Sequence, residues 1–306
     1  MILTVTLNTA LDLTYRVPRL LPHASHRVAD VAERPGGKGL NVARVLAALG
    51  HEVTATGFAG GRTGAAVREL LRAGSPGVVD ALAPCAGTTR RTVAVVDAAS
   101  GDTTQFNEPG PPITAPEWSR FLAGYESLLA GARAVALCGS LPPGVPVGAY
   151  ALLVRTARAA GVPVLLDTGG EPLRRGVAAR PDVIKPNAAE LAELTGSRDP
   201  LPATRDARRR GARAVVASLG PDGLLAATPE GTWRAAPPRA LAGNPTGAGD
   251  SAVAGLLSGL AEGLDWPARL ARAVALSAAT VASPTAGDFD PRTYEEVRGS
   301  VRVSAG

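Results

Sequence analysis

The chain has 306 residues, of which 45% are hydrophobic and 19% charged, and this composition excludes a wholly disordered protein. Its apolar runs are short and interrupted by Gly, Pro or Arg, which predicts no membrane span, and the N-terminal MILTVTLNTALD lacks the basic region of a signal peptide. The net charge of +5 raises nucleic acid as a partner. No aromatic side chains interleave the densest basic run, at 205–213, so a solvated helix face is favoured.

Strands and helices are predicted to alternate along most of the chain. Apolar β-rich runs fall at 2–7, 52–58, 133–139, 162–167, 182–186 and 213–220. Helical periodicity falls at 39–49, 63–73, 116–130, 147–160, 187–195, 203–210, 250–262 and 267–282. This order predicts an α/β fold with a doubly covered, mostly parallel central sheet, which binds ligands beyond the carboxyl ends of its strands.

Two stretches, 13–35 and 88–108, break the alternation, because they read as β segments with no helix between them. The second resembles a hairpin with its turn at DAASGD, residues 97–102. We expect these stretches to form a small β-sheet lid on a single domain that spans 1–306, since no low-complexity linker or internal repeat is present. Cys85 and Cys138 form no CxxC pair, which argues against a disulfide framework or a zinc site and favours a cytoplasmic location.

The stretch PGGKGLNVARVLAALG, residues 35–50, begins with a glycine-rich turn and continues into an amphipathic helix. Glycines permit close backbone approach to a ligand, and the start of a helix offers free N–H groups. The stretch matches neither the GxGxxG dinucleotide fingerprint nor a Walker loop. Glycine-rich turns before helices are common, so the pattern alone does not identify a site.

Two further stretches have both a structural and a functional interpretation. In VIKPNAAELAEL, residues 183–194, Asn187 and Glu190 have the spacing of a capping box, and the same spacing places an amide and a carboxylate where they could hold Mg²⁺ through water. In ASLGPDG, residues 217–223, a plain hairpin is favoured when the stretch is considered in isolation.

The stretch GNPTGAGD, residues 243–250, precedes the apolar helix SAVAGLLSGL. Its three small residues at a helix start form a nest of backbone donors suited to a polyanion. Asp250 stands at the end of this nest. It is either an ordinary helix cap or a catalytic base, and the stretch alone does not decide between the two.

Only two of the 32 basic residues are lysine, Lys38 and Lys185, and the rest are arginine. This bias is typical of coding pressure from a GC-rich genome. Lysines that persist under such pressure are candidates for positions that need a compact ammonium rather than a planar guanidinium. Chance is the alternative explanation.

Taken together and in this order, these motifs, with LNTALD, FNEPGP and CGSLPPG (138–144), resemble those of the ribokinase-like carbohydrate kinases of the PfkB family over essentially the full chain. The likeness is greatest to the hexose-phosphate branch of 1-phosphofructokinases and tagatose-6-phosphate kinases. It implies a ribokinase-like fold with a β-sheet lid, and in-line transfer of the γ-phosphoryl group of ATP to a sugar hydroxyl. ATP and Mg²⁺ are therefore the expected cofactors, and a monovalent cation is left open.

The resemblance also implies the residues that act. Asp250 is expected to be the general base, and the N–H groups of Gly247, Ala248 and Gly249 are expected to form the anion hole. The residues expected at the ATP phosphates and the nucleotide are Lys185, Asn187, Glu190, Ser218, Leu219, Gly220 and Gly223, with Mg²⁺ held by Asn187 and Glu190 through water. The residues expected at the sugar phosphate are Asp12, Gly36, Gly37, Lys38, Asn41, Arg90 and Ser140.

Two departures from the family pattern bear on the substrate. Gln105 stands where the minor 6-phosphofructokinase has a second lid arginine, and the lid lysine of that enzyme is replaced near Ser25. These changes favour fructose 1-phosphate, with tagatose 6-phosphate and fructose 6-phosphate as alternatives. A non-catalytic sugar-phosphate sensor is disfavoured because GAGD is intact, and a kinase for uncharged sugars is disfavoured because Arg90 and Lys38 would lack an anionic partner. The expected partners are ATP, a sugar phosphate and a second copy paired through the lid, with no nucleic acid and no membrane.

Overall fold

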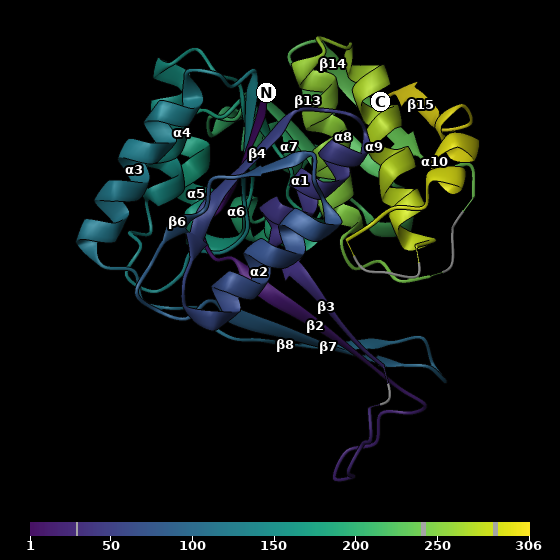
Figure 1. The fold of residues 1–306 in the computed structure, drawn as a ribbon. Coiled ribbons are helices and arrows are strands. Elements are labelled where there is room, and N and C mark those ends of the chain that lie inside the picture. The colour runs from purple at the N-terminus through teal and green to yellow at the C-terminus, as the bar shows by residue number, and fades with distance from the viewer. Residues whose placement is uncertain (29, 240–242, 284–286) are drawn as a thin grey trace.

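The computed structural model describes residues 1–28, 30–239, 243–283 and 287–306. Within them, eleven strands form a central sheet in the order β15-β14-β13-β12-β11-β10-β9-β1-β4-β5, with β6 paired to β4 (Figure 1). The strands from β12 to β5 run parallel, as the alternating pattern predicts. These strands are β1 (Ile2–Thr6), β4 (Val53–Ala59), β5 (Val78–Asp80), β6 (Ala83–Pro84), β9 (Ala134–Cys138), β10 (Val164–Asp167), β11 (Val183–Ile184) and β12 (Ala214–Ser218).

Helices cover both faces of the sheet, because side chains along each strand point alternately to either side. Ile2 of β1 packs into one core cluster, whereas Leu3 and Val5 pack into the other. The first cluster lies under α1 (Lys38–Ala48), α2 (Gly61–Gly74), α8 (Ala248–Ala261) and α9 (Trp266–Val281). The second lies under α3 (Ala115–Leu129), α4 (Ala149–Ala159), α5 (Gly170–Ala178), α6 (Ala188–Thr195) and α7 (Pro200–Arg209).

Several elements are absent from the sequence prediction. An antiparallel edge of β13 (Leu224–Thr228), β14 (Gly231–Ala236) and β15 (Arg302–Ala305) extends the sheet beyond β12. The helices α5 and α10 (Pro291–Arg298) were also not predicted, because proline and glycine interrupt the apolar periodicity of α5 and because α10 buries only Val297. The hairpin interpretation of 217–223 is confirmed, since β12 and β13 are antiparallel and joined through the 3₁₀ turn Gly220–Asp222.

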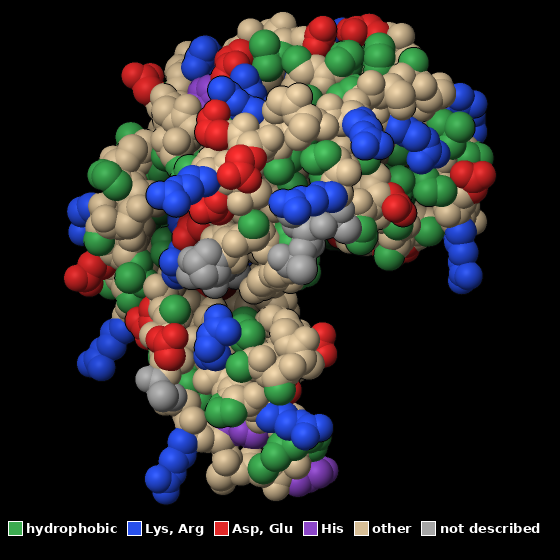
Figure 2. All heavy atoms as spheres, turned by 90° about the vertical axis from the view of Figure 1, so that its right-hand side faces the viewer, with side chains coloured by type: hydrophobic (Ala, Val, Ile, Leu, Met, Phe, Trp, Pro, Cys, Tyr) green, Lys and Arg blue, Asp and Glu red, His purple; other side chains and the backbone are tan. Residues whose placement is uncertain are grey.

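The lid is a second, four-stranded sheet in the order β3-β2-β7-β8, and it extends away from the body (Figure 1). Its strands are β2 (Ala10–Val17), β3 (Asp30–Gly36), β7 (Arg90–Asp97) and β8 (Thr103–Asn107), so both predicted stretches contribute and the hairpin turn lies where expected. Position 29 of the first stretch lies outside the described residues. The space-filling view shows the lid as a separate lobe, with a recess between it and the body (Figure 2).

None of the helices in the described part of the chain has the length and apolar character needed to span a bilayer. On the face drawn in Figure 2, basic side chains are scattered among acidic ones rather than gathered in a stripe. The run at 205–213 falls on and just beyond α7, where Asp206 pairs with Arg209 and Arg210. This pairing agrees with the interpretation of that run as a solvated helix surface.

Candidate active site

A cavity of about 1350 Å³ lies where the parallel strands end and the lid begins. Single-ligand pockets usually measure roughly 300–1,000 Å³, so this one has room for two substrates. Its wall is built by the loops after β1, β9, β10 and β11, by the end of β12, by the starts of α1 and α8, and by the lid. Most of the predicted site residues share this wall: Asp12, Gly37, Lys38, Asn41, Arg90, Ser140, Lys185, Asn187, Glu190, Ser218, Gly247, Gly249 and Asp250.

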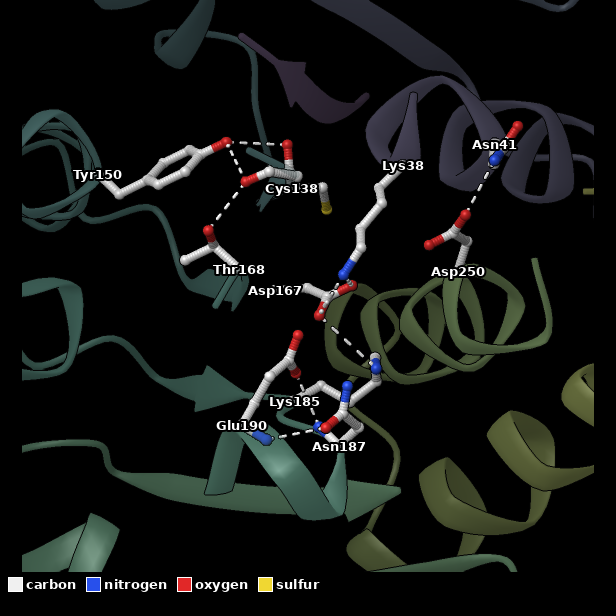
Figure 3. A network of polar contacts seen from close by, with 11 residues as sticks. Lys38, Asn41, Cys138, Tyr150, Asp167, Thr168, Lys185, Asn187, Glu190 and Asp250 are labelled. Atoms are coloured by element: carbon white, nitrogen blue, oxygen red, sulfur yellow. Dashed lines mark hydrogen bonds and ion pairs between the residues drawn. The ribbon is translucent and has the colours of Figure 1, made fainter. Parts of the chain in front are cut away.

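Asp250 is the third residue of α8, and it does not cap that helix. The N-cap is Gly247, which has a φ of 86° and no side-chain cap hydrogen bond. A carboxylate oxygen of Asp250 instead accepts a hydrogen bond of 2.9 Å from Nδ2 of Asn41, on α1. The cap interpretation is therefore wrong, and the carboxylate is held at the cavity between two helix starts (Figure 3).

The environment of Asp250 shifts its proton affinity. Burial raises the pKa of this carboxyl to about 6 and outweighs the lowering effect of the Lys38 ammonium, while the nearby Asp167 carboxylate adds to the increase. A general base works best when its pKa lies near the operating pH. Asp250 thus combines a position in the cavity with a proton affinity suited to accepting a proton from a hydroxyl group.

The backbone nest in front of Asp250 is smaller than the sequence predicts. Gly247 adopts a left-handed conformation that favours glycine, and this turns the chain into α8. The N–H of Ala248 donates to the carbonyl of Pro245 at 3.0 Å, so this expected anion-hole donor is already bonded. The turn that precedes the helix is the reason. Gly247 and Gly249, which line the cavity, remain as the expected donors.

Both lysines of the chain point into the same part of the cavity (Figure 3). The Nζ atom of Lys38 lies 3.4 Å from the Asp167 carboxylate, and Nζ of Lys185 lies 3.6 Å from it. Burial opposes the charged form of Lys38, but the carboxylates of Asp167, Asp250 and Glu190 outweigh it and raise its pKa above the usual value. These carboxylates therefore favour the charged form of Lys38 beside the candidate base.

Asn187 and Glu190 form the capping box that their spacing predicts. The Asn187 side chain accepts from the Glu190 N–H, and the Glu190 carboxylate accepts from the Asn187 N–H, each at 2.9 Å. No group of three or more His, Cys, Asp or Glu side chains in the described ranges is arranged to hold a metal ion. Mg²⁺ is usually held by one or two carboxylates plus waters and substrate phosphates, and Glu190 at the cavity wall fits that donor set.

The sugar-side residues gather where the lid joins the body. Gly36 leaves room for the Asp12 carboxyl group, because a Cβ at this position would lie 2.1 Å from it and would displace it. Burial of Asp12 raises its pKa, against the lowering effect of nearby Arg90. Arg90 donates from Nε to the Asn8 carbonyl at 3.2 Å, and Asn8 Nδ2 donates to Ser140 Oγ at 3.0 Å. Asn8 therefore joins two of the predicted sugar-phosphate residues.

The structure does not place the whole predicted nucleotide turn in the cavity wall. Ser218 lines the cavity, whereas Leu219, Gly220 and Gly223 lie in the turn after β12, which is closed by a hydrogen bond from Leu219 N–H to the Gly223 carbonyl. Sequence reasoning also missed Asp167 and Asn8. The signal for Asp167 was present, because it is the last residue of a predicted parallel strand.

Phosphoryl transfer relies on positioning and electrostatic stabilisation rather than on covalent chemistry by the protein. A buried carboxylate, backbone donors and two ammonium groups around one cavity define a phosphotransferase on a ribokinase-like α/β fold.

Comparisons with known proteins identify the class more closely. The model of the pfkB family carbohydrate kinases matches residues 3–292, and the chain belongs to that family. A 1-phosphofructokinase of Rhodobacter capsulatus is 40% identical over 285 residues, which cover 90% of each chain. Phosphofructokinase-2 from Escherichia coli, solved with potassium, is 29% identical with a TM-score of 0.89, over 97% of this chain and 98% of that one. A possible 1-phosphofructokinase from Thermotoga maritima is 28% identical with a TM-score of 0.91, over 100% and 99%.

Proposed function

We propose that this carbohydrate kinase transfers the γ-phosphoryl group of ATP to fructose 1-phosphate. The observation that carries the proposal is the juxtaposition of the buried Asp250 carboxylate, the α8 start and two lysines in a cavity large enough for both substrates. The 40% identical relative, a 1-phosphofructokinase, supports this substrate. A cytoplasmic location agrees with the unpaired cysteines, Cys85 and Cys138.

In the proposed mechanism, Asp250 accepts the proton of the attacking hydroxyl as that oxygen bonds to the γ-phosphorus, while the bond from the γ-phosphorus to the β–γ bridging oxygen breaks and ADP leaves. The hydrogen bond from Asn41 holds the carboxylate in place. Gly247 and Gly249 donate backbone N–H groups to the phosphoryl oxygens, and Lys185 offsets the negative charge on the ATP phosphates. Arg90 and Lys38 supply the positive charge that a phosphorylated sugar requires.

Mg²⁺ would be held through water by Glu190 and Asn187, and it would supply charge neutralisation at the ATP phosphates. The residues present fit this role, because Glu190 lines the cavity and retains Oε1 outside its capping hydrogen bond. The potassium complex of the Escherichia coli relative supports testing a monovalent cation as a second activator.

Gln105 supports fructose 1-phosphate over fructose 6-phosphate. It lines the cavity from β8, so the position that carries a second lid arginine in the minor 6-phosphofructokinase here presents an uncharged amide. Tagatose 6-phosphate is the second candidate substrate. A non-catalytic sensor is disfavoured because Asp250 is held in the cavity in the position of a base.

The deciding assay measures ATP consumption with fructose 1-phosphate, fructose 6-phosphate, tagatose 6-phosphate and free fructose. We expect the largest kcat/KM for fructose 1-phosphate and no measurable turnover of free fructose. A preference for free fructose would overturn the proposal, and so would inactivity with all three phosphates. A larger kcat/KM for either alternative phosphate would replace the first substrate with that one.

We also propose that the enzyme is a homodimer paired through the lids. Strand register places Val31 beside Tyr15, and Phe106 beside Val93, on one face of the lid. Phe106 is 60% exposed and Val31 50%, which is unusual for apolar side chains on a sheet. We expect a dimer in light scattering, and we expect Phe106→Glu to shift the protein to monomers. A wild-type monomer at micromolar concentration would contradict the pairing.

A further inference from the structure

The only two lysines of this chain approach the same buried carboxylate. Asp167 ends β10 and is 1% exposed. Lys38 reaches it from the first position of α1, with Nζ 3.4 Å from both carboxylate oxygens. Lys185 reaches it from just after β11, with Nζ 3.6 Å from Oδ1. Lys38 and Asp167 are 129 residues apart in sequence, and the fold thus brings distant segments together at the Asp167 carboxylate (Figure 3).

Both lysines lie near the start of α8 and the Asp250 carboxylate, rather than at opposite ends of the cavity. A Cβ on Gly249 would lie 3.6 Å from Nζ of Lys185, so this ammonium adjoins the backbone donors at the start of α8. Lys38 is close enough to Asp250 for each group to affect the pKa of the other. Both cations therefore flank the position that a phosphoryl group would occupy between Gly249 and Asp250.

Two ammonium groups do not stay side by side in a cavity without an anion between them, because like charges repel strongly at low dielectric. Asp167 supplies that anion. Being buried, it has little access to water and depends on the two lysines for compensation of its charge. The two lysine side chains differ in exposure, since Lys38 is 40% exposed and Lys185 only 5%, so Lys38 is the more accessible partner.

We propose that Asp167 is a positioning residue that holds Lys38 and Lys185 as a pair, so that both ammonium groups contact the phosphoryl group during transfer. Lys38 then serves the transferring group and is not confined to the phosphate already on the sugar. Asp167 lines the cavity but is only 1% exposed, so the proposal assigns it no direct contact with either substrate. This inference rests on the proposed kinase reaction, and it adds a shared counter-ion to it.

A double-mutant cycle tests the coupling. We expect Asp167→Asn to lower kcat by about 10²-fold, the range measured when one electrostatic stabiliser of a transition state is removed. In a Lys38→Met or Lys185→Met background, the same change should cost less than about tenfold, because its partner is already missing. An undiminished loss in both backgrounds would show that Asp167 acts independently of the lysines, for example on water around Mg²⁺, and would overturn the proposal.

The matched control is Asp182→Asn. Asp182 precedes β11, at the opposite end of the strand from the cavity, where its carboxylate accepts from the Val164 N–H. We expect kcat within twofold of the wild type. A loss in this control equal to that of Asp167→Asn would mean that any carboxylate beside these strands has the same effect, and it would count against the proposal.

A second measurement is independent of activity, of nucleotide and of Mg²⁺. Because the chain has only two lysines, acylation by an amine-selective reagent can be followed at Lys38 by peptide mass spectrometry. We expect Asp167→Asn to accelerate acylation of Lys38 at pH 8 several-fold, since the freed amine loses the carboxylate that holds it charged. An unchanged rate would overturn the tether even if the enzyme proves to use another sugar.

Asp167→Glu covers the case in which the Asn variant does not fold. It keeps the charge and moves it by one methylene. We expect Lys38 to stay protected from acylation while kcat falls, because the pair is retained but displaced. Normal kcat in the Glu variant would overturn the requirement for position. If the wild type phosphorylates no sugar phosphate, the kinase proposal fails, whereas the acylation experiment still reports on the Lys38–Asp167 pair.

Discussion

Replacing Asp250 by Asn should inactivate the enzyme and make it more stable. Burial raises the pKa of Asp250 from 3.8 to about 6, so the folded state disfavours the charged form. The stabilisation associated with a raised pKa is complete below pH 3.8 and is lost as the pH rises through 6. Two pKa units correspond to about 3 kcal/mol of unfolding free energy. The wild type loses this amount at pH 7.5 because Asp250 is charged, whereas the uncharged Asn variant keeps it.

The assay is urea unfolding of both proteins at two pH values. We expect Asp250→Asn to raise the free energy of unfolding by about 3 kcal/mol at pH 7.5. At pH 5 we expect about half of that gain, because Asp250 of the folded wild type is then mostly protonated. Its kcat should fall by about 10²–10⁴-fold. The exposed Asp102 provides the control, since Asp102→Asn should change neither quantity. Equal stability of the variant and the wild type at pH 7.5, or a gain independent of pH, would refute the reasoning.

Three further results are expected. The kcat/KM of the wild type should fall about tenfold between pH 7 and pH 5, with an acid limb near pH 6. Lys38→Met should move this limb to higher pH, because it removes a charge that lowers the pKa of Asp250. A flat profile down to pH 5 would exclude Asp250 as the base. Gly36→Ala should raise KM for the sugar phosphate at least tenfold, with little change in KM for ATP, because the new methyl group displaces Asp12; steady-state kinetics with either substrate varied would show it. Gln105→Arg should raise kcat/KM for fructose 6-phosphate relative to fructose 1-phosphate, and an unchanged ratio would remove Gln105 from the determinants of specificity.

Much of the fold follows from local pattern. Most of the parallel strands and their covering helices were predicted because apolar runs of two distinct periods alternate along the chain, although the short strands β5 and β6 and the helix α5 were not. The lid was predicted because 13–35 and 88–108 lack the helical period. The antiparallel edge was not predictable in the same way. Strand β15 pairs with β14 across more than sixty residues of intervening chain, and nothing local to Arg302–Ala305 indicates that partner.

The sequence predicted which residues belong to the site better than it predicted the contacts that they make there. Motif order indicated that Asp250, Lys38 and Lys185 belong together, but no motif says where a side chain points. That Asp250 bonds to Asn41 rather than capping α8 depends on how two helices are set against each other. The hydrogen bond from the Ala248 N–H to the Pro245 carbonyl likewise depends on the turn before α8. Asp167 belongs to none of the recognised motifs. A role for a single carboxylate at a strand end becomes evident only when the fold brings the two lysines next to it.

The join between lid and body has a mechanical consequence. Gly36 ends β3 and Lys38 begins α1, so one residue, Gly37, separates the lid sheet from α1. Any rotation of the lid against the body must be taken up at that residue or passed on to the first turn of α1. Gly37 is thus one of the joints between the lid and the body, and it directly precedes the residue that carries the Lys38 ammonium. A displacement far out on the lid would act on the backbone that positions this ammonium, without that part of the lid entering the cavity.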